Sequence, residues 1–138
     1  KRKLAWPYEG WGITNNGESL IISTGSSMLY FVNPCDFKIE KQVNIKNDYG
    51  FVSNLNELEF INGYVYANIW GEDYVMKIDT ESGIVKGKID FAGILQRPGV
   101  PYIGNKIDVL NGIAYNSVSN HLFITGKYWP VIFEIGFK

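Results

Sequence analysis

Two carboxylates, Glu57 and Glu59, stand two residues apart in a segment rich in strand-forming residues. Side chains at alternate positions of a β-strand point to the same face of a sheet. If both carboxylates are buried there, one of the two pKa values rises because neighbouring negative charges repel. A carboxyl group with a raised pKa is suited to general acid or base catalysis. Glu57 is therefore a candidate acid or base, and a structural role in bonding to a neighbouring backbone is the alternative.

Other reactive residue types are scarce. The single cysteine, Cys35, follows Pro34 in a turn-like segment and has no second cysteine with which to form an internal disulfide. With His121 as the only histidine, the chain lacks the Cys/His spacing of a zinc site. The words GWG and TGK are not followed by a helical pattern, so neither predicts a phosphate-binding loop. We expect neither a catalytic thiol nor a metal site.

Composition argues against several classes of partner. Of the 138 residues, 46% are hydrophobic, which is enough for the core of one globular domain. The formal net charge of −1 offers no basic surface for nucleic acid. Apolar stretches are far shorter than the roughly 20 residues of a membrane span. The first residues, KRKLAWPYEG, contain no apolar signal core, so we expect any targeting segment to lie upstream or to have been removed. The compartment stays undetermined.

The sequence repeats itself. Short runs rich in Val, Ile, Tyr and Phe alternate with Asn-Gly, Ser-Gly and Asn-Pro turns, and helical periodicity is scarce, so the predicted fold class is all-β. Matching the sequence to itself gives three blade-like units at residues 9–46, 54–91 and 108–138, with a loop at 92–107. The turns that align the units are Asn16-Gly17, Asn62-Gly63 and Ser119-Asn120.

A unit of four short strands and roughly 45 residues is the size of a β-propeller blade. We expect four antiparallel strands in each of the first two units and three in the third. Because known propellers have about four to eight blades, three units cannot close a ring. We therefore expect residues 1–138 to be part of one β-propeller domain. A free-standing antiparallel sandwich is the alternative, but it gives no reason for the repeat.

The words YEGWGIT, LNELEFINGYVYANIW, DVLNGIAY and LFITGKYWPVIFEI occur in this order, and the match runs from Glu9 to Ile135. Together they resemble the successive signatures of the plant and bacterial glutaminyl cyclase (glutamine cyclotransferase) family. The resemblance implies a five-bladed propeller with about two blades upstream of Lys1. It also implies a glutaminyl-peptide cyclotransferase, which converts the N-terminal glutamine of peptides to pyroglutamate and releases ammonia without a cofactor.

The resemblance extends to individual residues. Trp11 and Trp70 match tryptophans of the family's EGWG and NIW words and are implied to bind substrate. Asn56 and Lys127 match the asparagine of LNELE and the lysine of TGK and are implied to be catalytic. The family's catalytic glutamate lies in an upstream F-x-E-G word, which does not occur in this sequence. We therefore expect residues 1–138 alone to be inactive and the upstream blades to be a required partner.

The implied chemistry suits these residue types. Cyclisation needs a neutral α-amine held in attack geometry against its own side-chain carboxamide, together with donors for the developing oxyanion. Asn56 and Lys127 can supply such donors, and the indoles of Trp11 and Trp70 can supply flat walls. Ordinary packing of the two tryptophans, a backbone-tying role for Asn56 and solvation of Lys127 are the structural alternatives.

The repeat also relates residues outside this set. Asn56 and Asn111 occupy equivalent places in two units, and we assign Asn111 the structural role of tying the backbone of its strand. In the same repeat register, Glu57 falls at the place of Trp11 in the first unit. Glu9 precedes an inner strand, where a turn or capping role is the simplest interpretation.

A non-catalytic propeller that binds peptides or holds a larger complex together is the second functional hypothesis. The aromatic content is compatible with it, because stacking faces serve recognition without chemistry. The F-x-E-G glutamate separates the two hypotheses, since its presence upstream favours an enzyme and its absence favours a scaffold. The partners that we expect for the enzyme are peptides with N-terminal glutamine.

Overall fold

The chain folds into antiparallel sheets. The computed structural model describes residues 1, 3–102 and 104–137. Within them lie thirteen β-strands in three sheets and two short 3-10 helices. The all-β prediction is therefore confirmed. Among the described residues, no helix has the length and hydropathy of a membrane span, and no group of three or more His, Cys, Asp or Glu side chains is placed to hold a metal ion.

The first sheet is a simple meander in sequence order. Its polar turns close through side chains, as where Asn16 Oδ1 accepts the N–H of Ser19 at 2.7 Å. Such Asx contacts mimic a backbone turn and bring the next strand back alongside. The strands are β1 (Gly12–Asn15), β2 (Leu20–Ser23), β3 (Met28–Val32) and β4 (Ile39–Asn44).

The second sheet has more strands than the sequence predicts. Four strands form the expected meander, and two very short strands extend its outer edge, where Lys46 pairs in parallel with Ile84. The Lys46 N–H also donates to the carbonyl of Gly83 at 2.9 Å. In order from the outer edge inward, the strands are β6 (Gly50–Phe51), β5 (Lys46–Asn47), β10 (Ile84–Asp90), β9 (Tyr74–Asp79), β8 (Tyr64–Ile69) and β7 (Leu55–Ile61).

The third sheet has the three strands that the sequence predicts. They are β11 (Leu110–Asn116), β12 (His121–Gly126) and β13 (Phe133–Gly136), again in sequence order. The predicted loop before this sheet contains two single-turn 3-10 helices, η1 (Ile94–Gln96) and η2 (Gly104–Lys106). Ile94 of η1 is buried against the core, so part of this loop packs on the sheets.

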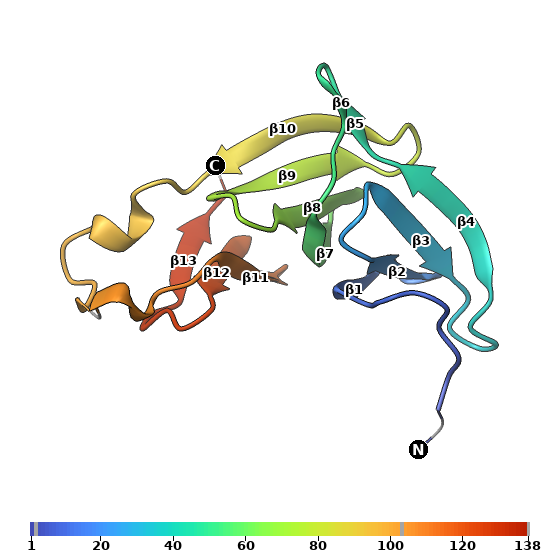
Figure 1. Cartoon of the computed structure of the whole chain (residues 1–138), viewed down its shortest axis with the longest axis horizontal. Coiled ribbons are helices and arrows are strands. Elements are labelled where there is room, and N and C mark those ends of the chain that lie inside the picture. The colour runs from blue at the N-terminus through green and yellow to red at the C-terminus, as the bar shows by residue number, and fades with distance from the viewer. Residues whose placement is uncertain (2, 103, 138) are drawn as a thin grey trace.

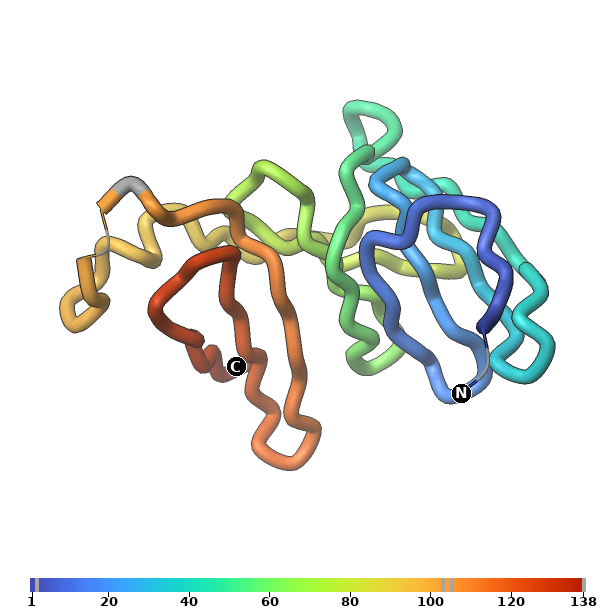
Figure 2. Tube along the Cα trace, turned by 60° about the horizontal axis from the view of Figure 1, so that its bottom comes forward, coloured from blue at the N-terminus to red at the C-terminus, as the bar shows by residue number. Residues whose placement is uncertain are grey.

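The first strands of the three sheets, β1, β7 and β11, lie next to one another, and the later strands fan outward from them (Figure 1). A second view shows the first and third sheets on opposite sides of the second (Figure 2). Apolar side chains fill the two interfaces. One cluster, which includes Leu29, Leu58 and Ile78, packs between the first and second sheets. Another, which includes Val75 and Leu122, packs between the second and third.

Side chains of the second strand in each of the first two sheets bond to the backbone of the next sheet. Ser23 Oγ, at the end of β2, donates to the carbonyl of Asn56 on β7 at 2.6 Å. Asn68 Oδ1, in the same place on β8, accepts the N–H of Gly112 on β11 at 3.0 Å. Ser23 and Asn68 are both fully buried, and these hydrogen bonds offset part of the cost of burying their polar groups, although Nδ2 of Asn68 has no partner in the described structure.

The inner strands themselves are joined in the same manner. Thr14 Oγ1 on β1 accepts the N–H of Phe60 on β7 at 3.1 Å. Glu59 Oε1 on β7 accepts the N–H of Tyr115 on β11 at 3.1 Å. Thr14 and Glu59 therefore hold equivalent places in consecutive repeats, and Glu59 has the structural role of bonding to a neighbouring backbone.

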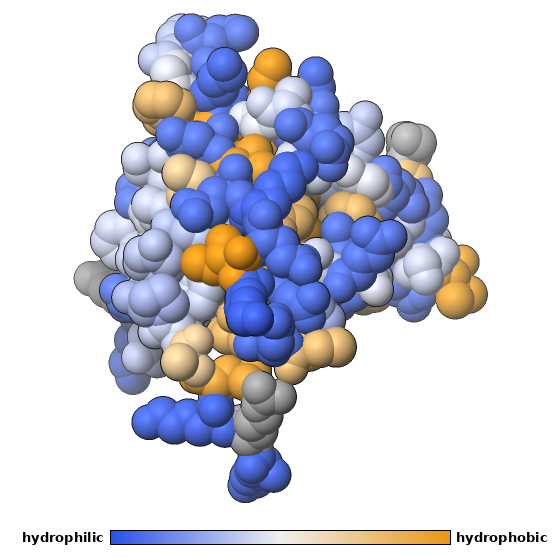
Figure 3. Space-filling model, turned by 90° about the vertical axis from the view of Figure 1, so that its right-hand side faces the viewer, coloured by the Kyte–Doolittle hydropathy of each residue, from blue (hydrophilic) through white to orange (hydrophobic). Residues whose placement is uncertain are grey.

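The N-terminal segment covers the outer face of the first sheet. The ring of Trp6 meets Tyr30 and Phe37 edge-on, at centroid distances of 5.5 Å and 5.9 Å, and the Tyr8 ring lies 4.8 Å from that of Tyr30. Viewed from the side of β4, the molecule is mostly hydrophilic with scattered apolar side chains (Figure 3). The alternation of half-buried and exposed residues along β4 is consistent with this surface.

Candidate functional site

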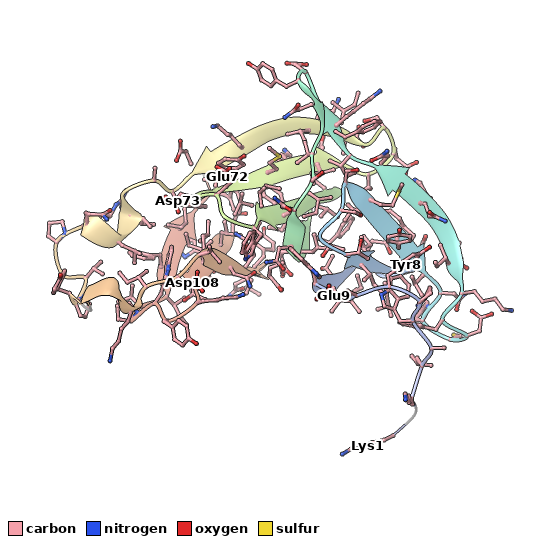
Figure 4. The ribbon with its side chains drawn as sticks, viewed as in Figure 1. Lys1, Tyr8, Glu9, Glu72, Asp73 and Asp108 are labelled. Atoms are coloured by element: carbon pink, nitrogen blue, oxygen red, sulfur yellow. The ribbon has the colours of Figure 1, made fainter. Side chains whose placement is uncertain are left out.

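A polar cavity of about 510 Å³ lies where the inner strands begin. Figure 4 shows Glu9 beside β1 and Asp108 before β11, close to the two sides of this region. The four residues that the family resemblance selects all line the cavity, although they come from three different sheets. Two further residues, Glu9 and Asn111, line it as well. The full lining set is Glu9, Trp11, Asn56, Trp70, Asn111 and Lys127.

Bulges in the inner strands set the positions of three lining residues. Strand β7 has a register irregularity at residues 56–57, and β11 has one at 111–112. The N–H of Trp11 donates to the carbonyl of Ser23 at 3.1 Å although Gly12 is the pairing partner of Ser23, so the first repeat has an extra residue at the same place. A bulge redirects a side chain away from the regular alternation of a strand. Trp11, Asn56 and Asn111 are equivalent residues by this criterion.

The register that the sequence predicted for Glu57 is wrong by one residue. Thr14 and Glu59 are equivalent by their hydrogen bonds, so Gly12 corresponds to Glu57 and Trp11 corresponds to Asn56. The error comes from the turns, which have different lengths. Residues 16–19 lie between the last pair of β1 and β2, whereas residues 62–63 lie between the last pair of β7 and β8. The two Asn-Gly pairs are therefore not structurally equivalent.

Two other lining residues follow the ends of second strands. The N–H of Trp70, after β8, donates to the carbonyl of Asn54 at 2.9 Å. The N–H of Lys127, after β12, donates to the carbonyl of Val109 at 3.0 Å. Trp70 and Lys127 are thus equivalent residues of the second and third repeats, and backbone pairing with the segment before the inner strand holds both at the cavity.

The first repeat has Gly25 at this place, and a packing requirement explains it. Gly25 has a φ of +74°, and a Cβ added to it would lie 2.6 Å from the indole ring of Trp11. The ring of Trp11 therefore occupies the space that a side chain at residue 25 would fill. It meets the ring of Trp70 edge-on, with centroids 6.5 Å apart and an interplanar angle of 72°. The two indoles form adjacent apolar walls, an arrangement that favours binding of a small apolar chain.

The polar side chains of the cavity are not used for internal bonding. Among the described residues, the side chains of Glu9, Asn56 and Lys127 make no hydrogen bond or ion pair, although Asn56 is only 6% exposed. The Oδ1 atom of Asn111 is enclosed and has no partner in the described structure. An unsatisfied buried polar atom costs about 1–3 kcal/mol. The cavity therefore presents free donors and acceptors, as a ligand site does.

Glu57 does not line this cavity. Burial raises the pKa of the Glu57 carboxyl, and the nearby charge of Glu59 raises it further. Burial also raises the pKa of Glu59, against the opposing effect of its hydrogen bond from the Tyr115 N–H. Both carboxyl groups are half-buried on β7, which is the shared face that the sequence predicts. The catalytic role of Glu57 stays a prediction, and the cavity gives it no support.

Sequence reasoning missed the place of two residues. It predicted that the Asn111 side chain hydrogen-bonds to the backbone of its own strand. Instead, Asn68 binds the N–H of Gly112, and the Asn111 side chain makes no such bond among the described residues. Equivalence with Asn56 was the signal that could have placed Asn111 in the cavity. Glu9 was interpreted as a turn residue, and no pattern in the sequence separates that role from a place in the cavity wall.

A cavity lined by the family's own sequence words suggests a relationship that comparison can decide. A family model described as glutamine cyclotransferase matches residues 1–137. The chain belongs to the glutamine cyclotransferase family. The resemblance inferred from the sequence words is thereby confirmed.

Relatives of known sequence and structure agree with this family. The glutaminyl-peptide cyclotransferase of Arabidopsis thaliana is 37% identical over 131 residues, which are 94% of this chain and 40% of that protein. The crystal structure of Myxococcus xanthus glutaminyl cyclase is 40% identical with a TM-score of 0.86, over 97% of this chain and 57% of that one. This chain thus spans less than two thirds of either relative.

A more distant likeness concerns the fold alone. A streptogramin B lyase superposes with a TM-score of 0.50 at 12% identity, over 97% of this chain and 43% of that one. The Arabidopsis and Myxococcus relatives are both described as cyclotransferase or cyclase enzymes, and neither is described as a binding or scaffold protein. The comparisons therefore give the non-catalytic hypothesis no support.

The first testable prediction concerns the glycine beneath Trp11. Gly25→Ala should lower the free energy of unfolding more than Gly17→Ala, because both residues have positive φ but only Gly25 contacts a ring. Backbone strain alone costs about 1–2 kcal/mol, and the clash should add about 1–3 kcal/mol. Urea unfolding measures both losses. Tryptophan fluorescence should change in Gly25→Ala alone, and equal losses with unchanged spectra would contradict the packing argument.

The second prediction concerns pH. Because the pKa of Glu57 is raised in the folded state, this group contributes most to stability below its unfolded pKa of about 4.3. The contribution is lost as the pH rises through the raised value. Glu57→Gln should therefore be more stable than wild type at pH 7, with the difference shrinking toward pH 4. Urea unfolding across this range tests it, with exposed Glu72→Gln as the control. A difference that does not vary with pH would refute it.

Proposed function

We propose that this cavity holds the N-terminal glutamine of a peptide and that the full-length protein is a glutaminyl-peptide cyclotransferase. The observation that carries the proposal is the gathering of Trp11, Asn56, Trp70 and Lys127 around one cavity, with no described internal partner for the Asn56 and Lys127 side chains. Family membership supports the reaction class. The Arabidopsis relative, described as a glutaminyl-peptide cyclotransferase, supports the substrate class.

The reaction joins two groups of the same residue. The neutral α-amine attacks the carbon of the side-chain carboxamide, and a C–N bond forms while negative charge develops on the amide oxygen. The bond to the amide nitrogen then breaks, and ammonia leaves after that nitrogen gains a proton. The proton released by the attacking amine balances the proton gained by the leaving group, so one carboxylate can carry both transfers.

Asn56 and Lys127 are the donors that we assign to the developing oxyanion. Asn56 is buried at the bulge of β7, and Lys127, which follows β12, brings a positive charge to the same cavity. Fixed donors aimed at developing charge stabilise a transition state more than a ground state, because they need no reorganisation as the charge forms. The indoles of Trp11 and Trp70, inclined at 72° to each other, confine the aliphatic part of glutamine in attack geometry.

The carboxylate that transfers the proton must also be assigned to a residue. Glu9 is the one carboxylate among the described lining residues, and it is exposed to solvent. The resemblance implies a glutamate in an F-x-E-G word, and residues 1–138 contain no such word. We propose that this glutamate comes from another part of the full-length protein. In this proposal the units at 9–46, 54–91 and 108–138 are three blades of a five-bladed propeller.

The third prediction tests the two donors in the full-length product of the gene. Asn56→Ala and Lys127→Ala should each lower kcat/KM by about 10- to 1000-fold, the range for losing one oxyanion donor or positioning group. Release of ammonia from a glutaminyl dipeptide gives the rate. The matched control is Lys46→Ala, which removes an exposed ammonium at the outer edge of the second sheet. Unchanged turnover in both cavity variants would refute their assigned roles.

The fourth prediction separates this chain from the full-length product. Residues 1–138 expressed alone should release no measurable ammonia from a glutaminyl dipeptide, because the proposed site lacks its proton-transfer carboxylate. The full-length product should be active under the same conditions. Turnover by residues 1–138 at the full-length rate would show that their own carboxylates suffice. Glu9 and Glu57 would then be the first residues to replace.

A further inference from the structure

Asn111 combines a place in the cavity wall with an unused amide. Its side chain lines the cavity, and its Oδ1 atom is enclosed without a hydrogen-bond partner in the described structure. The Nδ2 atom is not among the enclosed unpartnered atoms, and no bond of the Asn111 side chain to another described residue is present. Nδ2 is therefore the end of the amide that is open to the cavity.

A structural explanation for this asparagine fails. The backbone of its bulge is already held, because Asn68 Oδ1 binds the N–H of Gly112 at 3.0 Å. The segment before the bulge is held by backbone bonds in both directions between residues 108–109 and Lys127. A leucine has the same branched arrangement of four side-chain heavy atoms and leaves no unsatisfied oxygen. Asn68 also has one unpartnered amide atom, but it binds a backbone N–H, whereas the Asn111 side chain makes no bond to a described residue. An asparagine that holds no backbone in place is typical of a residue kept for function.

Asn111 and Asn56 stand at bulges of adjacent inner strands. Gly112, the second residue of the β11 bulge, has a φ of +147°, and a Cβ added there would lie 2.8 Å from the Cγ2 atom of Thr125. The bulge in β11 therefore depends on a glycine, whereas the β7 bulge has Glu57 at this place without a positive φ. Both asparagines nevertheless line the same cavity. Two adjacent inner strands thus bring one amide each to the same cavity.

We propose that Asn111 contacts the substrate, with its Nδ2 donating a hydrogen bond to a carbonyl oxygen of the bound glutaminyl residue. This inference rests on the proposed function and adds a third donor to Asn56 and Lys127. A glutaminyl residue within a peptide has two carbonyl oxygens, one on the side-chain carboxamide and one on the peptide bond. Three donors around one cavity serve both oxygens, and this orients the residue for attack by its own amine.

The test compares Asn111→Leu and Asn68→Leu in the full-length product of the gene. Asn111→Leu should unfold at the same urea concentration as wild type or at a higher one, because it removes an unsatisfied atom. Its kcat/KM for a glutaminyl dipeptide should fall about 10- to 100-fold, the effect of losing one donor. Its Kd for the product, a pyroglutamyl dipeptide, should rise, because the product loses the same hydrogen bond. Asn68→Leu should lose stability, because it leaves the N–H of Gly112 without its acceptor.

Every other outcome contradicts either the inference about Asn111 or the proposed function. Loss of stability in Asn111→Leu with unchanged kcat/KM would assign Asn111 to the structure and overturn the inference. Unchanged stability, kcat/KM and Kd would overturn it as well. If wild type binds a glutaminyl dipeptide but releases no ammonia, the proposed function fails, and the Kd of Asn111→Leu for that dipeptide still decides the inference. A wild-type protein that neither binds nor reacts would overturn both.

Discussion

The arrangement of the three sheets depends on side chains that bond across from one sheet to the backbone of the next. Among the described residues, backbone hydrogen bonds between neighbouring sheets at the inner strands are confined to Gly25, which bonds with Asn54 and Leu55. Side chains therefore fix most of the offset along the strands. Ser23 and Asn68 fix this offset at one end of the inner strands. Thr14 and Glu59 fix it nearer the other end. Bulges at equivalent residues can meet around one cavity only because this offset is constant.

The same repeat therefore has two classes of polar residue. One class, which includes Ser23 and Asn68, bonds to the backbone of the adjacent sheet. The other class, which includes Asn56 and Lys127, faces the cavity and makes no bond among the described residues. For Asn56 the difference arises from the bulge in β7, because one inserted residue turns the following alternation by one position. Structural and functional side chains can then lie next to each other on one strand.

The all-β class and the family could be predicted from the sequence, because strand alternation, turn residues and long motif words are local signals. The roles of Trp11, Asn56, Trp70 and Lys127 stay predictions, although all four line one cavity. The equivalence of Glu57 with Trp11 failed because two turns with the same Asn-Gly pair have different lengths. The strands β5 and β6 were missed because they are two residues long and form through a distant parallel partner, Ile84. Asn111 was misjudged because its role depends on what Asn68, far away in the sequence, already does.

The β5–β6 hairpin makes the two sheet interfaces unequal in stiffness. It links the end of the first sheet to the outer edge of the second, so these two sheets are joined at both the inner and the outer end. The outer ends of the second and third sheets, at β10 and β13, are instead separated by a cavity of about 370 Å³. The third sheet is therefore expected to swing about its inner strand more freely than the first. Such a swing would carry Lys127 and Asn111 together relative to Asn56 and Trp70, so the width of the site would vary along a single direction.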